Sequence, residues 1–160
     1  MTDFPALLRA LSVAGVEYIL VGGAAATAQG ASRLTVDIDI LYRRTPENID
    51  RIVTALGAHR PYLRGAPLGL PFSLDHATID RGLNFTLATD LGDVDLFGEL
   101  TGGGTYERLA PGADVLSVFG VSVRCLSLDQ LIDVKRAAGR PKDLEALAEL
   151  EAIREERRER

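Results

Sequence analysis

Short stretches of continuous or alternating hydrophobic residues, separated by glycine and proline, run along most of the chain. Residues 16–21 form an apolar run with β-branched and aromatic side chains, which predicts a buried strand. Apolar and polar positions alternate over residues 36–42, so a strand there places its apolar side chains on one face. Asp37 and Asp39 then project together from the opposite face.

Similar signals predict the remaining elements. Strand-like segments joined by tight turns at Asp90-Leu91-Gly92 and near Gly120 predict two hairpins. Helices are predicted where capping residues, a proline in the first turn or a terminal glycine frame a segment. The hairpin strands are residues 83–88 with 93–97 and 115–119 with 121–126, and the helices cover about 4–14, 24–29, 46–57, 74–79, 127–138 and 141–156. The segment 60–72 is rich in proline and glycine and is predicted to be a loop.

This mixture of helices and hairpins predicts an α+β fold with a mixed, mostly antiparallel sheet that is flanked by helices. A length of 160 residues fits one domain, and 46% hydrophobic residues can fill its core. We therefore expect a single domain over residues 1–160. Its core would span about residues 16–126, and C-terminal helices would follow at about 127–156.

Composition narrows the chemistry that the chain can perform. Cys125 is the single cysteine and the two histidines lie far apart, so a disulfide within the chain and a Cys/His zinc site are excluded. A metal would have to be bound by carboxylates, the ligands of hard cations such as Mg²⁺ and Mn²⁺. The net charge of -5 argues against a large nucleic-acid-binding surface. Without an apolar segment of bilayer length or a basic N-terminal signal, we expect a cytoplasmic protein with no membrane partner.

The tripeptide Asp37-Ile38-Asp39 is the strongest chemical signal in the sequence. Residues i and i+2 of a strand lie about 7 Å apart on one face, where two carboxylates repel by roughly 2–3 kcal/mol at an effective dielectric constant of about 20. A divalent cation removes this cost, and two-metal phosphoryl-transfer sites use such a pair. Taken alone, the pattern is more often simply the polar face of a half-exposed strand.

A neighbouring glycine pair favours the metal-binding interpretation of Asp37 and Asp39 over that of a simple polar strand face. Gly22-Gly23 lies directly between the first predicted strand and a short helix of small residues. Glycine lets the backbone approach a phosphate closely, and a helix N-terminus favours negative charge. Such a pair alone is an ordinary strand-to-helix turn. Followed by a strand with two acids, it predicts a phosphate-binding turn and metal ligands that converge on one nucleotide.

The segment VGGAAATAQGASRLTVDIDIL resembles the signature of the nucleotidyltransferase superfamily, which has the polymerase β-like fold. In that signature a hydrophobic strand ends in Gly-Gly or Gly-Ser, and an Asp-x-Asp strand follows a short helix. The segments FTLATDLGDVDLFGEL and LSLDQLIDVKRAAGRPKDLEAL are similar to further parts of the branch of AbiEii-type toxin nucleotidyltransferases and their relatives. The resemblance covers about residues 16–150.

The resemblance implies a role for each matching residue. Asp37 and Asp39 would bind Mg²⁺ or Mn²⁺, and Asp95 would complete the metal site and help to activate an acceptor hydroxyl. Asp93 shares a strand face with Asp95 and is the competing assignment for the third acid. The glycine pair would donate backbone N–H groups to the triphosphate of a nucleotide such as ATP. Gly23 stands where many members have serine, so backbone amides would have to suffice there.

Positive charge for a triphosphate has several candidate sources. Arg33 precedes the Asp-x-Asp strand, Lys135 lies late in the helix at 127–138, and Lys142 and Asp143 belong to the Arg-Pro-Lys-Asp turn. Lysine and arginine bind phosphates readily. Cations in the last turn of a helix and acids in its first turn also follow from the helix dipole alone. We treat these four residues as candidates for nucleotide binding.

Together these features predict a magnesium-dependent enzyme that moves a nucleoside monophosphate from a triphosphate to a hydroxyl acceptor. The resemblance implies RNA, particularly tRNA, or a protein as the acceptor in a toxin–antitoxin system. The alternative enzyme uses a small-molecule acceptor such as an aminoglycoside-like alcohol, and the alternative to an enzyme is a non-catalytic nucleotide- or partner-binding module. A cognate antitoxin, another partner or an oligomer would supply the recognition surface that a short chain lacks.

Overall fold

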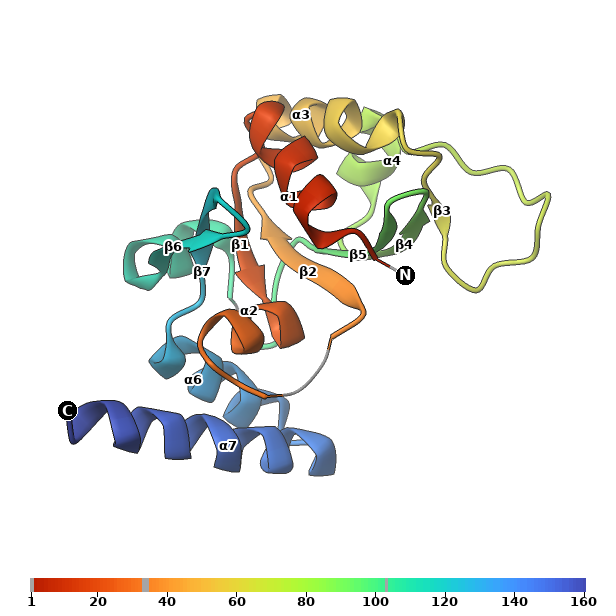
Figure 1. Cartoon of the computed structure of the whole chain (residues 1–160). Coiled ribbons are helices and arrows are strands. Elements are labelled where there is room, and N and C mark those ends of the chain that lie inside the picture. The colour runs from red at the N-terminus through yellow and green to blue at the C-terminus, as the bar shows by residue number, and fades with distance from the viewer. Residues whose placement is uncertain (1, 33–34, 103) are drawn as a thin grey trace.

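A seven-stranded mixed sheet forms the centre of the computed structural model, which describes residues 2–32, 35–102 and 104–160 (Figure 1). The order of the strands across the sheet is β3-β4-β5-β2-β1-β7-β6. Strand β2 pairs in parallel with β5, and β1 pairs in parallel with β7, whereas the other neighbouring strands are antiparallel. The strands are β1 (Tyr18–Val21), β2 (Asp37–Tyr42), β3 (Tyr62–Leu63), β4 (Phe85–Thr89), β5 (Gly92–Phe97), β6 (Asp114–Val118) and β7 (Val121–Cys125).

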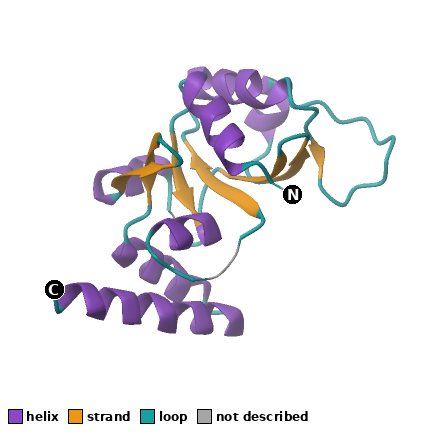
Figure 2. Ribbon diagram, in the orientation of Figure 1, coloured by secondary structure: helices purple, strands orange, loops and turns teal. Residues whose placement is uncertain are grey.

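Helices cover both sides of this sheet, which confirms the predicted α+β class (Figure 2). Helices α1, α3 and α4 pack together on one side, and α2, α6 and α7 lie on the other (Figure 1). Within the described part of the chain, no helix is long and apolar enough to cross a membrane. The helices are α1 (Phe4–Val13), α2 (Gly22–Ala28), α3 (Pro46–Gly57), α4 (His76–Arg81), α5 (Tyr106–Leu109), α6 (Leu128–Ala138) and α7 (Pro141–Arg158), with a 3-10 turn at Ala110–Gly112.

The ends of α6 follow the sequence signals closely. The Ser127 side chain accepts a hydrogen bond from the backbone N–H of Gln130, and the Gln130 side chain accepts one from the backbone N–H of Ser127. This reciprocal capping box satisfies two helix donors that would otherwise have no partner. Gly139 ends the helix with φ +64°, in the left-handed conformation that glycine adopts without strain. These local signals fix where α6 begins and where the turn into α7 lies.

The apolar face of β2 lies in the core, and this fixes which way its acids point. Ile38 and Ile40 are fully buried. Asn48 of α3 is also fully buried on this side of the sheet. Its side chain connects α3 to the residue before β1, because it accepts a hydrogen bond from the Glu17 N–H (2.6 Å) and donates one to the Glu17 carbonyl (2.9 Å). Since side chains alternate along a strand, burying the isoleucines directs the β2 acids to the opposite face.

Two parts of the chain differ from the sequence prediction. The segment 60–72 contains the short strand β3, which pairs with β4 at the edge of the sheet, so it is not loop throughout. Residues Tyr106–Leu109 and Ala110–Gly112 form a helical turn and a 3-10 turn that the sequence pattern did not predict. Elements of two to four residues carry too little periodicity to be seen in sequence, and β3 depends on pairing with a distant strand.

Candidate functional site

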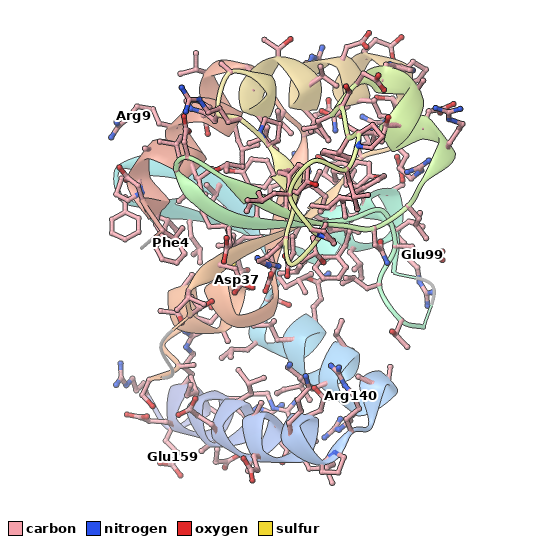
Figure 3. All side chains as sticks on the ribbon, turned by 90° about the vertical axis from the view of Figure 1, so that its right-hand side faces the viewer. Phe4, Arg9, Asp37, Glu99, Arg140 and Glu159 are labelled. Atoms are coloured by element: carbon pink, nitrogen blue, oxygen red, sulfur yellow. The ribbon has the colours of Figure 1, made fainter. Side chains whose placement is uncertain are left out.

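Four aspartates lie side by side on two adjacent strands at the centre of the sheet. The parallel pairing of β2 and β5 sets Asp37 opposite Asp93 and Asp39 opposite Asp95. Because residues i and i+2 of a strand share a face and directly paired residues do too, all four side chains project from the same face. In Figure 3, Asp37 lies between the sheet and the layer of helices α6 and α7.

Three of these side chains converge closely enough to share a metal ion. Asp37, Asp39 and Asp95 each offer a carboxylate oxygen, and these oxygens lie within 4.8 Å of one another. Asp93 is outside this group, and its side chain is 37% exposed compared with 18% for Asp95. The Oδ1 atom of Asp39 is buried and has no hydrogen-bond partner among the described residues. A buried oxygen without a donor is costly unless a cation binds it, so these residues fit a hard divalent cation.

The glycine pair brings the backbone against the acids. Gly22 has φ +60°, and a Cβ there would overlap Asp39 Oδ2 and lie 2.9 Å from Asp39 Cγ, so the position accepts only glycine. A Cβ at Gly23 would lie 3.2 Å from Thr35 Oγ1, which is a tight but adjustable contact. The Thr35 hydroxyl, which donates to the Asp37 carbonyl oxygen (3.0 Å), thus lies close to where a serine at position 23 would place its side chain.

Burial and mutual repulsion change the protonation of Asp39. Desolvation raises its pKa to about 7, with further contributions from the negative charges of Asp37 and Asp95 and from a hydrogen bond to the Asp95 side chain. The backbone N–H of Gly23 lowers the pKa but offsets only part of the increase. In metal-free protein near neutral pH the Asp39 carboxyl is therefore partly protonated, and a bound divalent cation would compete with this proton.

Arg64 is the site residue that the sequence analysis missed. Its Nη2 forms an ion pair with Asp95 Oδ1, and its Nη1 lies 3.5 Å from Asp93 Oδ2 and 3.9 Å from Asp37 Oδ2. The residue directly follows β3, inside the segment that was expected to be a loop. A single arginine between proline and glycine residues gives no local signal, because only the pairing of β3 with β4 directs it toward the acids.

A cleft beside these acids separates the sheet from the C-terminal helices. One cavity of about 290 Å³ is lined by the glycine pair, Asp39, Phe97 and Lys135, among others. A second cavity of about 200 Å³ shares the glycine pair, Asp39 and Lys135 and extends toward α7. The two cavities meet at Asp39 and the glycine pair, and two neighbouring cavities are the arrangement that a reaction between two bound molecules requires.

A buried acid organises the cations on the far wall of the cleft. Asp143 is 1% exposed, and its carboxylate accepts hydrogen bonds from Lys135 Nζ (3.3 Å), Arg140 Nε (2.7 Å) and the Arg140 backbone N–H (3.1 Å). Hydrogen bonds from Arg140 are the largest cause of a low Asp143 pKa, about 2. The geometry thus gives Asp143 the role of orienting Lys135 and Arg140, which both line the larger cavity.

The remaining basic candidates lie in different surroundings. Lys142 is exposed and does not line either cavity described above. Arg136, the residue after Lys135, pairs with Glu151 at 2.8 Å on the surface. Arg33 lies outside the described residues. Of the predicted nucleotide-binding residues, the structure therefore brings Gly22, Gly23, Lys135 and Asp143 around one cleft.

Solved structures with a similar fold are nucleotidyltransferases by name. TM1012 from Thermotoga maritima, a protein assigned as a nucleotidyltransferase, aligns with a TM-score of 0.58 and 18% identity over 98% of this chain and 91% of that chain. The antibiotic-resistance factor ANT(2″)-Ia aligns with a TM-score of 0.55 and 15% identity over 99% and 94% of the two chains. Its complex with adenylyl-2″-tobramycin gives a TM-score of 0.57 and 16% identity over 98% and 95%.

The chain therefore has the nucleotidyltransferase fold, as its sequence predicts. No model of a protein family matches the sequence, and no curated protein matches it. At sequence identities of 15–18%, the similarity to these structures shows a shared fold and does not show a shared activity. Arguments about activity must therefore come from the site itself.

Proposed function

We propose that the protein is a divalent-metal-dependent nucleotidyltransferase, which transfers a nucleoside monophosphate from a nucleoside triphosphate to a hydroxyl acceptor. One observation carries the proposal. Three carboxylates converge within 4.8 Å beside a glycine turn, and the buried Oδ1 of Asp39 lacks a hydrogen-bond partner among the described residues. The fold that the chain shares with nucleotidyltransferases supports the same reaction class.

The residues of the cleft would have different roles in this reaction. Asp37, Asp39 and Asp95 would hold Mg²⁺ or Mn²⁺, which when bound supplies positive charge for the phosphates and lowers the pKa of the acceptor hydroxyl. The glycine pair and Lys135 would bind the triphosphate through backbone N–H groups and an ammonium group. Asp143 would keep Lys135 in place.

The chemical step is an in-line displacement. Asp95 takes the proton of the acceptor hydroxyl, and the hydroxyl oxygen attacks the α-phosphorus. A new oxygen–phosphorus bond forms as the bond between the α-phosphorus and its bridging oxygen breaks, and pyrophosphate leaves with the electron pair. Because this chemistry needs positioning and charge neutralisation rather than a covalent intermediate, loss of any acid of the cluster should remove most of the rate.

The acceptor class separates two versions of this proposal. The resemblance to toxin nucleotidyltransferases favours RNA, particularly tRNA, or a protein, with a cognate antitoxin as a further partner. A small hydroxyl-bearing acceptor is favoured by the net charge of -5, which opposes binding of a polyanion. It is also favoured by the match to ANT(2″)-Ia over 95% of that chain, a protein solved with adenylyl-2″-tobramycin.

A transfer experiment tests the class and the acceptor together. The protein is incubated with each α-³²P-labelled triphosphate and Mg²⁺. Separate reactions contain total cellular RNA, a protein extract or an aminoglycoside mixture as the acceptor pool. We expect label to move onto one acceptor pool with release of pyrophosphate. Binding of the triphosphate without transfer to any pool would instead favour the non-catalytic module.

Matched aspartate variants provide the control. Asp37→Asn removes one carboxylate of the cluster, whereas Asp133→Asn removes an exposed carboxylate from α6 and changes the net charge by the same amount. We expect the first variant to lose transfer by about 10²-fold or more and the second to retain it. Equal transfer by both variants would refute the assignment.

A further inference from the structure

Arg64 reaches the acids across the full width of a neighbouring strand. Its backbone N–H donates to the Thr86 carbonyl at 3.0 Å, which continues the pairing of β3 with β4 by one residue. Thr86 pairs with Asp95 in the next strand, and Asp95 pairs with Asp39. These residues form a row that runs from the residue after β3 across β4, β5 and β2, and the long arginine side chain extends from the edge of the sheet toward the central acids.

The guanidinium group is built into the carboxylate cluster. The Arg64 side chain is 26% exposed, which is low for an arginine next to an edge strand. It pairs with Asp95 and lies within 4.0 Å of Asp93 and Asp37, so one cation serves three acids. Its Nη1 is buried and forms no hydrogen bond to the described residues. The cluster thus contains a fixed positive charge whose hydrogen-bonding capacity is only partly used.

Arg64 and a divalent cation would compete for the same carboxylate groups. Two of the three acids that could share a metal ion, Asp37 and Asp95, are also ion-pair partners of Arg64. A carboxylate oxygen that contacts a guanidinium cannot also coordinate a metal in the same direction without moving the arginine. Two positive charges a few ångströms apart would also repel each other strongly in a partly buried site.

Resting on the proposed function, we propose that Arg64 is a resident counter-ion of the carboxylate cluster, which a divalent cation must displace in order to bind. The side chain thereby sets the metal affinity of the free protein and keeps three neighbouring acids compatible with folding when metal is absent. Arg64 acts here as a positioning residue, because it works through Asp95 and its neighbours rather than on the reacting atoms.

Titration with Mn²⁺ in the absence of nucleotide tests this inference, with free Mn²⁺ measured by electron paramagnetic resonance. Arg64→Gln removes the competing charge and keeps most of the side-chain length, so we expect its Kd for Mn²⁺ to fall about tenfold below that of the wild type. Arg64→Lys keeps the charge and should bind Mn²⁺ nearly as the wild type does. It also allows the test if the glutamine variant fails to fold, because a tenfold gain in Mn²⁺ affinity in Arg64→Lys, which keeps the charge, would contradict the proposal.

Arg60→Gln is the matched control. Arg60 is exposed and lies four residues before Arg64, and its substitution removes the same charge. We expect its Kd to change by less than about twofold, as a screened surface charge should. Equal effects of Arg64→Gln and Arg60→Gln, or weaker binding by Arg64→Gln, would overturn the inference while leaving the metal site intact. If Asp39→Asn binds Mn²⁺ as tightly as the wild type, or no variant binds it, the proposed function itself fails.

Discussion

Asp39 and Asp95 face each other across the parallel strands β2 and β5, and their carboxylates are close enough to share a proton. Neither strand can turn its acid away, because the alternate positions Ile38 and Val94 are fully buried on the opposite face. The sheet therefore forces like charges together, and the protein must relieve the repulsion with a proton, a cation or both.

The first prediction is that metal-free protein loses stability as pH rises. The folded-state pKa of Asp39 is raised from 3.8 to about 7, mainly by burial. A carboxyl whose pKa is raised by folding contributes stability that is fully present below its unfolded pKa and is lost as pH rises through its folded pKa. We expect the free energy of unfolding in the presence of a chelator to fall by on the order of 1–2 kcal/mol between pH 5 and pH 8. Thermal melts should show this loss of stability as a decrease in Tm with rising pH.

Asp39→Asn and added Mg²⁺ are the controls for this effect. The asparagine variant has no carboxyl to titrate at this position, so its Tm should change less with pH than that of the wild type. Mg²⁺ competes with the proton and should raise the wild-type Tm more at pH 8 than at pH 5.5. A Tm that depends on pH equally in both proteins would show that Asp39 does not carry the effect.

The second prediction separates the two glycines. Gly22→Ala forces a side chain into positive φ and into the Asp39 carboxylate, so we expect a loss of about 2–4 kcal/mol in unfolding free energy and loss of Mn²⁺ binding. Gly23→Ala places its Cβ against the Thr35 side chain, and alanine favours the helix, so the change should stay within about 1 kcal/mol. Denaturant unfolding of both variants measures the difference. Similar losses in the two variants would mean that the close approach of Gly22 to Asp39 is not what makes position 22 sensitive.

Part of this site could be predicted because its signals are local in sequence. The glycine turn and the two acids of β2 lie within 18 residues, and their alternation and spacing specify the face on which they meet. Asp95 lies far away in sequence, and its place as the third acid follows from the resemblance to a family motif rather than from periodicity. The sheet register then places the two acids on one face.

The parts that escaped prediction depend on distant contacts. Arg64 reaches the acids only because a two-residue strand pairs at the sheet edge, and no pattern within residues 60–72 encodes that pairing. Lys142 and Asp143 are adjacent in sequence, yet one is exposed and the other is buried. Which side of a helix faces its neighbour is set by how α7 packs against α6, and a short motif does not specify that rotation.

The third prediction concerns the acid behind the cleft. Asp143→Asn keeps the shape of the side chain but removes the charge that holds Lys135 and Arg140. We expect the KM for the triphosphate to rise about tenfold with a smaller change in kcat, because the orienting interaction acts in binding. The Asp143 pKa is lowered to about 2, so its stabilisation is present above the unfolded pKa of 3.8 and is lost only in strong acid. The pH dependence of Tm between pH 5 and pH 8 should therefore stay as in the wild type.

Arg136→Gln is the control for that measurement. Arg136 pairs with Glu151 on the surface of the same helix layer and does not line the larger cavity. Its loss should leave KM within about twofold, because exposed ion pairs contribute little. An equal rise in KM for both variants would indicate a general effect of charge on nucleotide binding rather than orientation by Asp143.

The fourth prediction concerns the attachment of α7 to the sheet, on which the far wall of the cleft depends. Gln29 is 2% exposed, and its side chain donates to the Leu126 carbonyl (2.9 Å) and to Asp114 Oδ2 (2.9 Å). Arg157 of α7 donates to the Gln29 carbonyl (2.6 Å) and to Gln29 Oε1 (3.1 Å). Arg157→Ala removes two charged donors from nearly buried acceptors, so we expect a loss of about 1–3 kcal/mol, or roughly 2–9 °C in Tm.

Arg158→Ala provides the comparison, because Arg158 is the next residue of the same helix and is exposed like Arg157, but its side chain forms no hydrogen bond to the described residues. Its Tm should stay within about 1–2 °C of the wild type, since an exposed side chain without a buried hydrogen-bond partner contributes little to stability. Hydrogen exchange then locates the effect. If α7 is fixed through Gln29, Arg157→Ala should accelerate exchange in α7 more than in β1 and β2, and uniform acceleration across these elements would instead indicate that the whole fold had been weakened.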